Sequence, residues 1–168
     1  ELSKLTNKEK SLIIGSIEPN NFLAGYKLMH SLAALHGQKL EYKSAVNAKK
    51  EWNSVALLGD YVTKAAVERK KGLDKAVEEL GNIKLIDAMP ANWSEKEAYK
   101  KISGLSRRTN IDIVWAANDP MAFGAFSALE QNSTTEAFSV GGINWDISRV
   151  NAPVDISYGG HVILGGFA

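Results

Sequence analysis

Short apolar runs alternate with stretches of helical pattern along most of this chain. The runs that predict strands lie at 12–15, 55–58, 83–86, 111–115, 138–142 and 155–158. Helical patterns of ten or more residues separate several of them, the first at about 20–36. A strand, a helix and a second strand in this order form a right-handed crossover between parallel strands. We therefore expect an α/β fold, with a doubly wound, mostly parallel sheet of about six strands flanked by helices.

Capping residues refine the ends of two predicted helices. Thr63 is the expected N-cap of the second helix, and Gly81 follows its last turn at C′. Ser94 and Glu97 have the spacing of a capping box at the start of the next helix. The polar stretch 38–53 is predicted to be a connection between the first helix and the second strand.

Composition narrows the class of protein. The 168 residues suffice for one domain, and 45% hydrophobic residues can build a core. The 20 basic and 19 acidic residues nearly cancel, so no nucleic-acid partner is expected. No apolar run approaches the roughly 18 residues of a membrane span, so no membrane insertion is expected. Cysteine is absent, which leaves no disulfide and no thiolate chemistry.

The sequence contains no recognisable motif for catalysis or cofactor binding. The glycine pairs at 141–142, 159–160 and 165–166 form neither a dinucleotide fingerprint nor a phosphate-binding loop. The three histidines do not have metal-ligand spacing, and no serine stands in a nucleophile-elbow motif. The sequence therefore predicts a protein that is not an enzyme and needs no cofactor or metal.

Polar and aromatic residues follow the ends of the predicted strands. They are Asp60, Trp93, Asn118, Asp119, Asn144 and His161, and Arg69 on the second helix lies near enough to reach the same edge. The carboxyl ends of parallel strands meet at one edge of a sheet, where open α/β sheets hold ligands. Amide, carboxylate and guanidinium groups pair with hydroxyls, while an indole covers an apolar C–H face. This set favours a carbohydrate-like ligand.

Several of these residues have simpler structural explanations. Asp119 precedes Pro120 and is expected to be the N-cap of the following helix, although one carboxylate can also contact a ligand. Asn118 is then the residue expected to face the ligand. Trp93 could form a hydrophobic staple, but its partner position holds only Ala98. Arg69 lies in a charged run that by itself indicates a solvated helix face, and His161 fits a loop or helix start.

Several segments, taken in order, match the pattern of one family. They are 15–25, 66–73, 90–93, 117–125, 141–146 and 158–161. Residues 117–125 are almost identical to the family motif N-D-x-M-A-x-G-A. Together these segments resemble the type I periplasmic binding proteins, the sugar-binding components of bacterial ABC importers of the ribose/galactose-binding kind. Effector cores of LacI-type repressors are relatives of that family.

The resemblance implies roles for individual residues. Arg69, Trp93, Asn118 and Asn144 take positions whose counterparts contact sugar, and Asp60 lies at another pocket-edge position. Asn144 stands where the family usually has aspartate, which leaves ligand preference open. The segment between 146 and 155 is also short for the helix that the family places there.

The resemblance also implies what the chain belongs to. Residues 1–168 are expected to form a single lobe, the C-terminal one of a two-lobed protein, with the first lobe absent. The expected protein is periplasmic, binds a small solute such as a sugar, and delivers it to an ABC transporter permease. Two alternatives stay open: an effector-binding core of a LacI-type transcription regulator, and an extracytoplasmic sensor domain of a membrane receptor. Binding by the lobe alone is expected to be weak, because contacts from the other lobe are missing.

Overall fold

Five parallel strands form a single sheet in the order β2-β1-β3-β4-β5. The computed structural model describes residues 6–10, 19–42, 51–132, 137–144 and 156–159. The strands are β1 (Trp52–Leu58), β2 (Ile83–Pro90), β3 (Ile113–Ala116), β4 (Ser139–Asn144) and β5 (Ile156–Gly159). The chain adds β2 on one side of β1, and then β3, β4 and β5 on the other. This confirms the predicted doubly wound α/β fold; the strand predicted at 12–15 lies outside the described residues.

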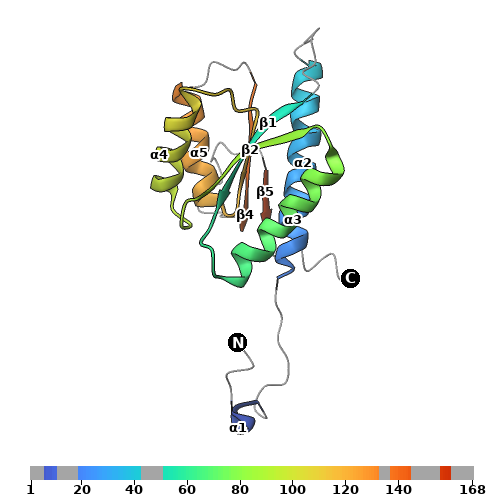
Figure 1. Ribbon diagram of the computed structural model, residues 1–168, viewed down its shortest axis with the longest axis vertical. Helices are drawn as coiled ribbons and strands as arrows, with labels where there is room; N and C mark the ends of the chain where they lie inside the picture. The colour runs from blue at the N-terminus through green and yellow to red at the C-terminus, as the bar shows by residue number, and fades with distance from the viewer. Residues whose placement is uncertain (1–5, 11–18, 43–50, 133–136, 145–155, 160–168) are drawn as a thin grey trace.

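Helices cover both faces of the sheet (Figure 1). The described helices are α1 (Asn7–Lys10), α2 (Asn21–Tyr42), α3 (Lys64–Leu80), α4 (Glu95–Ser106) and α5 (Asp119–Asn132). The α2 and α3 helices lie together on one face, while α4 and α5 lie together on the other. All four residues of β3 are buried, as expected for a central strand covered on both sides.

Close backbone contact joins α2 to α3. A Cβ at Gly72 would lie 2.0 Å from the carbonyl oxygen of Phe22, and one at Gly25 would lie 2.1 Å from that of Arg69. Any larger residue at either glycine would push the helices apart. The contact therefore fixes the backbone of Arg69 against the start of α2.

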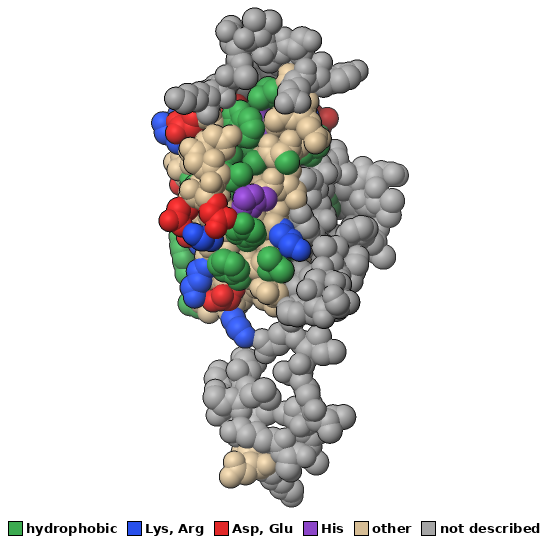
Figure 2. All heavy atoms as spheres, turned by 90° about the vertical axis from the view of Figure 1, so that its right-hand side faces the viewer, with side chains coloured by type: hydrophobic (Ala, Val, Ile, Leu, Met, Phe, Trp, Pro, Cys, Tyr) green, Lys and Arg blue, Asp and Glu red, His purple; other side chains and the backbone are tan. Residues whose placement is uncertain are grey.

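The outer surface of α2 and α3 carries acidic and basic side chains next to one another (Figure 2). Lys70 pairs with Asp74 at 2.6 Å, and Lys71 pairs with Glu68 at 2.8 Å. These pairs are largely solvated, so each contributes little to stability. The buried side chains between the helices and the sheet are what stabilise this layer.

The predicted caps are mostly confirmed. The Thr63 hydroxyl accepts a hydrogen bond from the Ala66 backbone N–H, and Gly81 ends α3 at φ 66°. Ser94 accepts from the Glu97 N–H at 3.3 Å. The return half of the capping box is not formed, because the Ser94 N–H donates instead to the Ala91 carbonyl oxygen at 2.9 Å.

Two element boundaries differ from the sequence prediction. The α2 helix continues to Tyr42, so the first residues of the predicted 38–53 connection are helical. Gln, Lys, Leu and Glu at 38–41 are good helix formers, and Lys39 donates to the Phe138 carbonyl oxygen at 2.9 Å. The β2 strand extends to Pro90, which pairs with Leu58 of β1.

Candidate functional site

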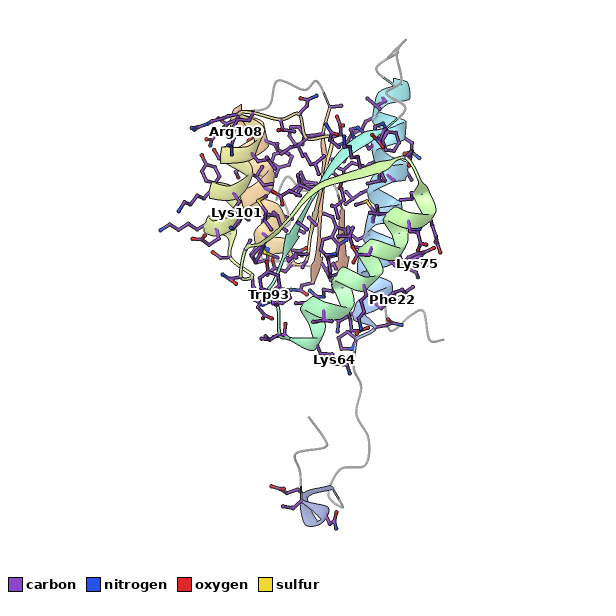
Figure 3. All side chains as sticks on the ribbon, viewed as in Figure 1. Phe22, Lys64, Lys75, Trp93, Lys101 and Arg108 are labelled. Atoms are coloured by element: carbon purple, nitrogen blue, oxygen red, sulfur yellow. The ribbon has the colours of Figure 1, made fainter. Side chains whose placement is uncertain are left out.

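The strand order brings the predicted residues to neighbouring positions along one edge. Trp93 follows β2, Asp60 follows β1, Asn118 follows β3 and Asn144 ends β4, in the same sequence as the strands in the sheet. Figure 3 places Trp93 at the end of the sheet where α2 and α3 begin. This is the carboxyl edge, where open α/β sheets bind ligands.

The Trp93 ring is held in a fixed position. Asn92 and Trp93 have φ angles of 48° and 61°, which is left-handed backbone that bulky residues rarely adopt. Such a conformation costs roughly 1–3 kcal/mol per residue, so the surroundings must impose it. The indole lies over Gly59, where a Cβ would come within 2.1 Å of the ring, and its Nε1 donates to Asp60 Oδ2 at 2.9 Å.

Asp60 organises the loop after β1. Its Oδ1 accepts from the backbone N–H groups of Val62 at 2.8 Å and Thr63 at 2.6 Å. The Thr63 N–H and the Trp93 indole are the main causes that lower the pKa of Asp60 to about 2. The carboxylate is therefore ionised at neutral pH and oriented by both strand ends.

Arg69 projects from α3 into the middle of this edge. Its Nε donates to Asn21 Oδ1 at 2.9 Å, and its Nη2 donates to Asn144 Oδ1 at 3.2 Å. Its Nη1 donates to the carbonyl oxygen of Ala117 at the end of β3. The guanidinium carbon lies 5.8 Å from the centroid of the Trp93 ring, within the range of a cation–π contact.

Burial changes the role that Arg69 can play. The residue is 8% exposed, and burial lowers the pKa of its guanidinium, an effect opposed by the negative charge of Asp119. Three of the five N–H donors of an arginine already have protein acceptors here. Arg69 therefore joins α2, β3 and β4, and at most one N–H on each terminal nitrogen is left for a ligand.

Asn118, and not Asp119, is the N-cap of α5. Its Oδ1 accepts from the Met121 N–H at 3.0 Å, the bond that an N-cap side chain makes with the third helical residue. Asp119 is the first residue of the helix and is 1% exposed, so the prediction that it caps is wrong. The Asn118 Nδ2 donates to the Trp93 carbonyl oxygen at 3.1 Å, which ties β3 to the strained loop.

Asn144 is the exposed amide of the site. Its φ is 132°, and its Oδ1 accepts from Arg69, so the side chain is anchored while its surface stays open. His161, also predicted, lies outside the described residues. The structure therefore brings Trp93, Arg69, Asn118 and Asn144 together with Asp60, and buries Asp119 beneath them.

Two residues that matter to this geometry were not predicted. Asn21 is the acceptor for Arg69 Nε, and Gly59 provides the space for the indole. Gly59 directly follows an apolar strand, which is a signal for close approach of another group. Asn21 carries no comparable signal, because its partner is 48 residues away.

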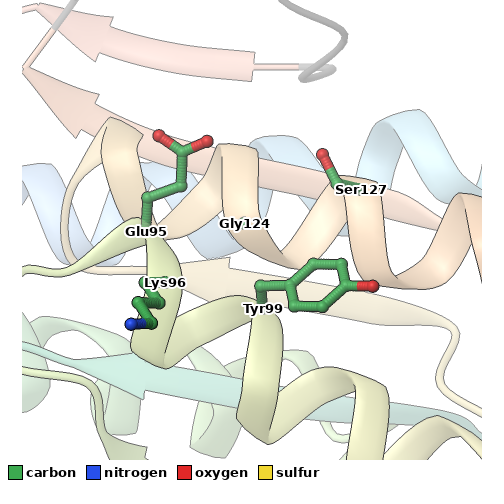
Figure 4. Close-up of a pocket in the computed structure, with 5 residues that line it drawn as sticks. All are labelled: Glu95, Lys96, Tyr99, Gly124 and Ser127. Atoms are coloured by element: carbon green, nitrogen blue, oxygen red, sulfur yellow. The ribbon is translucent and has the colours of Figure 1, made fainter.

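One pocket is lined in part by α3 on one side of the sheet, and another by α4 and α5 on the other side. The first, of about 170 Å³, adjoins the site and is lined by Leu58, Asp60, Tyr61, Ala66, Val67, Lys70 and Lys71. The second, of about 490 Å³, lies between α4 and α5 and is lined by Glu95, Lys96, Tyr99, Gly124 and Ser127 (Figure 4). The second contains none of the predicted site residues, so it is separate from the polar edge.

The described residues, 6–10, 19–42, 51–132, 137–144 and 156–159, contain neither a metal site nor a membrane-spanning helix. Within them, no group of three or more His, Asp or Glu side chains is arranged to hold a metal ion. Across the same ranges, no helix combines the length and apolar character required for a membrane span.

A parallel α/β sheet with aromatic, amide and charged groups along its carboxyl edge is typical of α/β proteins that bind small molecules. Residues 5–150 match the family model described as periplasmic binding protein domain. The chain belongs to this family.

Curated relatives are sugar- and polyol-binding proteins by name. The D-apiose import binding protein of Actinobacillus succinogenes is 28% identical over 76% of this chain and 38% of its own length. The xylitol-binding protein of Mycolicibacterium smegmatis is 30% identical over 77% of this chain and 34% of its own. The galactofuranose-binding protein of Escherichia coli is 30% identical over 74% of this chain and 37% of its own length. This chain thus spans little more than a third of the length of these relatives.

Solved structures agree with the family assignment. A periplasmic sugar-binding protein from Pseudomonas fluorescens has a TM-score of 0.72 and 27% identity, covering 97% of this chain and 49% of its own. An ABC transporter periplasmic solute-binding protein from Actinobacillus succinogenes with bound D-allose has a TM-score of 0.67 and 27% identity. The match covers 88% of this chain and 50% of the solute-binding protein from Actinobacillus succinogenes.

Proposed function

We propose that this chain is the ligand-binding lobe of an ABC-transporter solute-binding protein that captures a sugar or similar small polar solute. The observation that carries the proposal is the fixed position of the Trp93 ring at the carboxyl edge. The backbone of Trp93 is left-handed, Gly59 leaves room for the indole, and Asp60 accepts its N–H. A ring fixed in this way loses little conformational entropy when a ligand binds, which favours affinity.

The neighbouring groups suit a ligand rich in hydroxyls. Asn144 offers an exposed amide, and Asp60 an ionised carboxylate that has capacity for further hydrogen bonds. The face of the Trp93 indole can cover the apolar C–H side of a sugar ring. A site of this kind discriminates strongly, since a wrong ligand leaves buried polar groups without partners.

Arg69 and Asn118 contribute mainly by holding the others in place. Arg69 anchors Asn144, and Asn118 anchors the Trp93 loop while it caps α5. Their remaining N–H groups and lone pairs are available to the ligand, as the family resemblance implies. Asp119 supports them through its charge, which offsets the buried guanidinium.

In the intact protein, residues 1–168 act as one lobe, and a second lobe closes over the solute. The relatives, which are about two and a half to three times longer than the matched region, support this division. We further propose a periplasmic location, delivery to an ABC permease, and no catalytic step. These proposals follow the curated relatives, which are named as binding proteins.

The direct test is a calorimetric titration of the intact protein with neutral sugars and polyols: D-apiose, D-allose, xylitol and myo-inositol. Tight binding of at least one, raising the melting temperature through mass action, supports the proposal. Binding to none of them would count against the proposal. DNA binding controlled by a small effector, or coupling to a membrane receptor, would favour one of the two alternatives.

A further inference from the structure

The α4 helix and the turn after it carry a concentration of positive charge. Residues 95–108 contain two acidic side chains and five cations, Lys96, Lys100, Lys101, Arg107 and Arg108. This is an excess of three positive charges in a chain whose net charge is +1. Lys101 is half-buried and the other four cations are exposed.

These cations lack the ion pairs found on the neighbouring surface. On α3, Lys70, Lys71 and Lys75 each pair with an acid three or four residues away. In the described part of the chain, no ion pair joins any of these five cations to a carboxylate. Residues 64–80 of α3 also hold five cations, but four acids accompany them, so this surface is nearly neutral while residues 95–108 keep an excess of three positive charges.

The cations share the outward side of α4. Lys96 and Lys100 are four residues apart, and Arg107, in the turn after the helix, follows Lys100 by seven residues, which is about two helical turns. The opposite side buries Ala98 and Ile102 in the core. Figure 3 shows Lys101 and Arg108 on the side of α4 away from the sheet. The helix is about 18 Å long, so the charges form an extended stripe.

We propose that this basic face, Lys96, Lys100, Lys101, Arg107 and Arg108, docks on anionic phospholipid headgroups. The large hydrophobic side chains exposed in the described residues are Phe22, Tyr61, Val62 and Val67, and none lies on α4. A protein partner would normally bury an apolar centre within a polar rim. Anionic headgroups need none, because they move laterally to match a stripe of cations and attract each one near the surface.

This inference does not depend on the proposed solute. The basic face begins beside the Trp93 loop and runs along α4 away from the polar edge. Docking by this side leaves the carboxyl edge of the sheet uncovered. A protein that binds no sugar could still bind vesicles, so failure of one proposal is distinguishable from failure of the other.

Vesicle co-sedimentation of the intact protein tests the inference. Vesicles with about 30% phosphatidylglycerol in phosphatidylcholine are compared with pure phosphatidylcholine at about 25 mM and 500 mM NaCl. We expect binding only to the anionic vesicles at low salt. The triple variant Lys100→Gln, Arg107→Gln, Arg108→Gln should bind about 100-fold more weakly, since each cation near the surface contributes about fivefold.

A matched variant separates this face from net charge. Lys70→Gln, Lys71→Gln, Lys75→Gln likewise removes three surface cations, but from α3, where Lys70 is half-buried and the other two are exposed. It should retain most of the binding, and circular dichroism should show both variants folded. Equal losses in the two variants, or no binding of the unaltered protein to anionic vesicles at low salt, would overturn the proposal. Binding to polyglutamate resin but not to vesicles would overturn it as well.

Discussion

The indole N–H of Trp93 donates to Asp60 Oδ2 at 2.9 Å and so joins the loops that follow β2 and β1. The two residues are 33 positions apart in the chain, yet each orients the other. Asp60 fixes the rotation of the indole, and the indole helps keep Asp60 ionised. Ligand binding should therefore be sensitive to Asp60 even where Asp60 does not touch the ligand.

The variant Asp60→Ala tests this coupling. It removes the acceptor of the indole N–H and of two loop N–H groups, so the Trp93 ring gains freedom. We expect affinity for the solute to fall about tenfold or more in a titration of the intact protein. Asp74→Ala, which removes an exposed carboxylate of α3, is the control and should leave the affinity unchanged.

The low pKa of Asp60 predicts a specific acid sensitivity. A carboxylate whose pKa in the folded protein is about 2, below the usual 3.8 of an aspartate, stabilises the fold above pH 3.8. That contribution is lost as the pH falls from about 4 through 2. Urea unfolding of Asp60→Asn should show a smaller loss of stability across this range than the unaltered protein. Identical pH profiles for the variant and the unaltered protein would mean that Asp60 has the same pKa in the folded and the unfolded protein.

Gly59 should matter for solute binding because the Trp93 ring occupies the space where a side chain at position 59 would lie. The side chain in Gly59→Ala would lie 2.1 Å from the Trp93 ring, so the indole must move. We expect a large loss of solute affinity. Gly104→Ala on α4 is the control, since its Cβ would meet no atom within 4 Å. That change should leave binding intact and stabilise the helix by roughly 0.5–1 kcal/mol.

The two roles of Asn118 can be separated by two substitutions. Asn118→Ser retains an oxygen that can cap α5 but removes the amide that holds the Trp93 carbonyl. Asn118→Ala removes both and should cost about 1 kcal/mol in unfolding free energy. We expect Asn118→Ser to keep most of the stability while losing solute affinity. A variant with both properties unchanged would show that the amide bond to the loop is unimportant.

The fold could be predicted from the sequence because its signals are local. Apolar runs such as 111–115 and caps such as Thr63 and Gly81 depend on neighbouring residues alone. The extension of α2 to Tyr42 was missed, because a polar run is compatible with either a helix or a connection.

The candidate site was predicted only in outline. The positions after each strand were identified, since parallel strands share one edge, but the bonds among them depend on strand order and backbone angles. Periodicity could not distinguish Asn118 from Asp119 as the cap, because both stand at the same strand-to-helix corner. Likewise, the charged run around Arg69 suggested solvent, whereas the Ala117 carbonyl and Asn144 hold its guanidinium inside.

The most direct measurement is the solute affinity of the intact protein with Trp93 replaced by phenylalanine or glycine. Trp93→Phe keeps an aromatic face but loses the bond to Asp60, whereas Trp93→Gly removes the ring and suits the left-handed backbone. We expect a modest loss of affinity for Trp93→Phe and a loss of about 100-fold for Trp93→Gly, with the fold retained in both. Unchanged affinity in Trp93→Gly would contradict the assignment of this edge as the solute site.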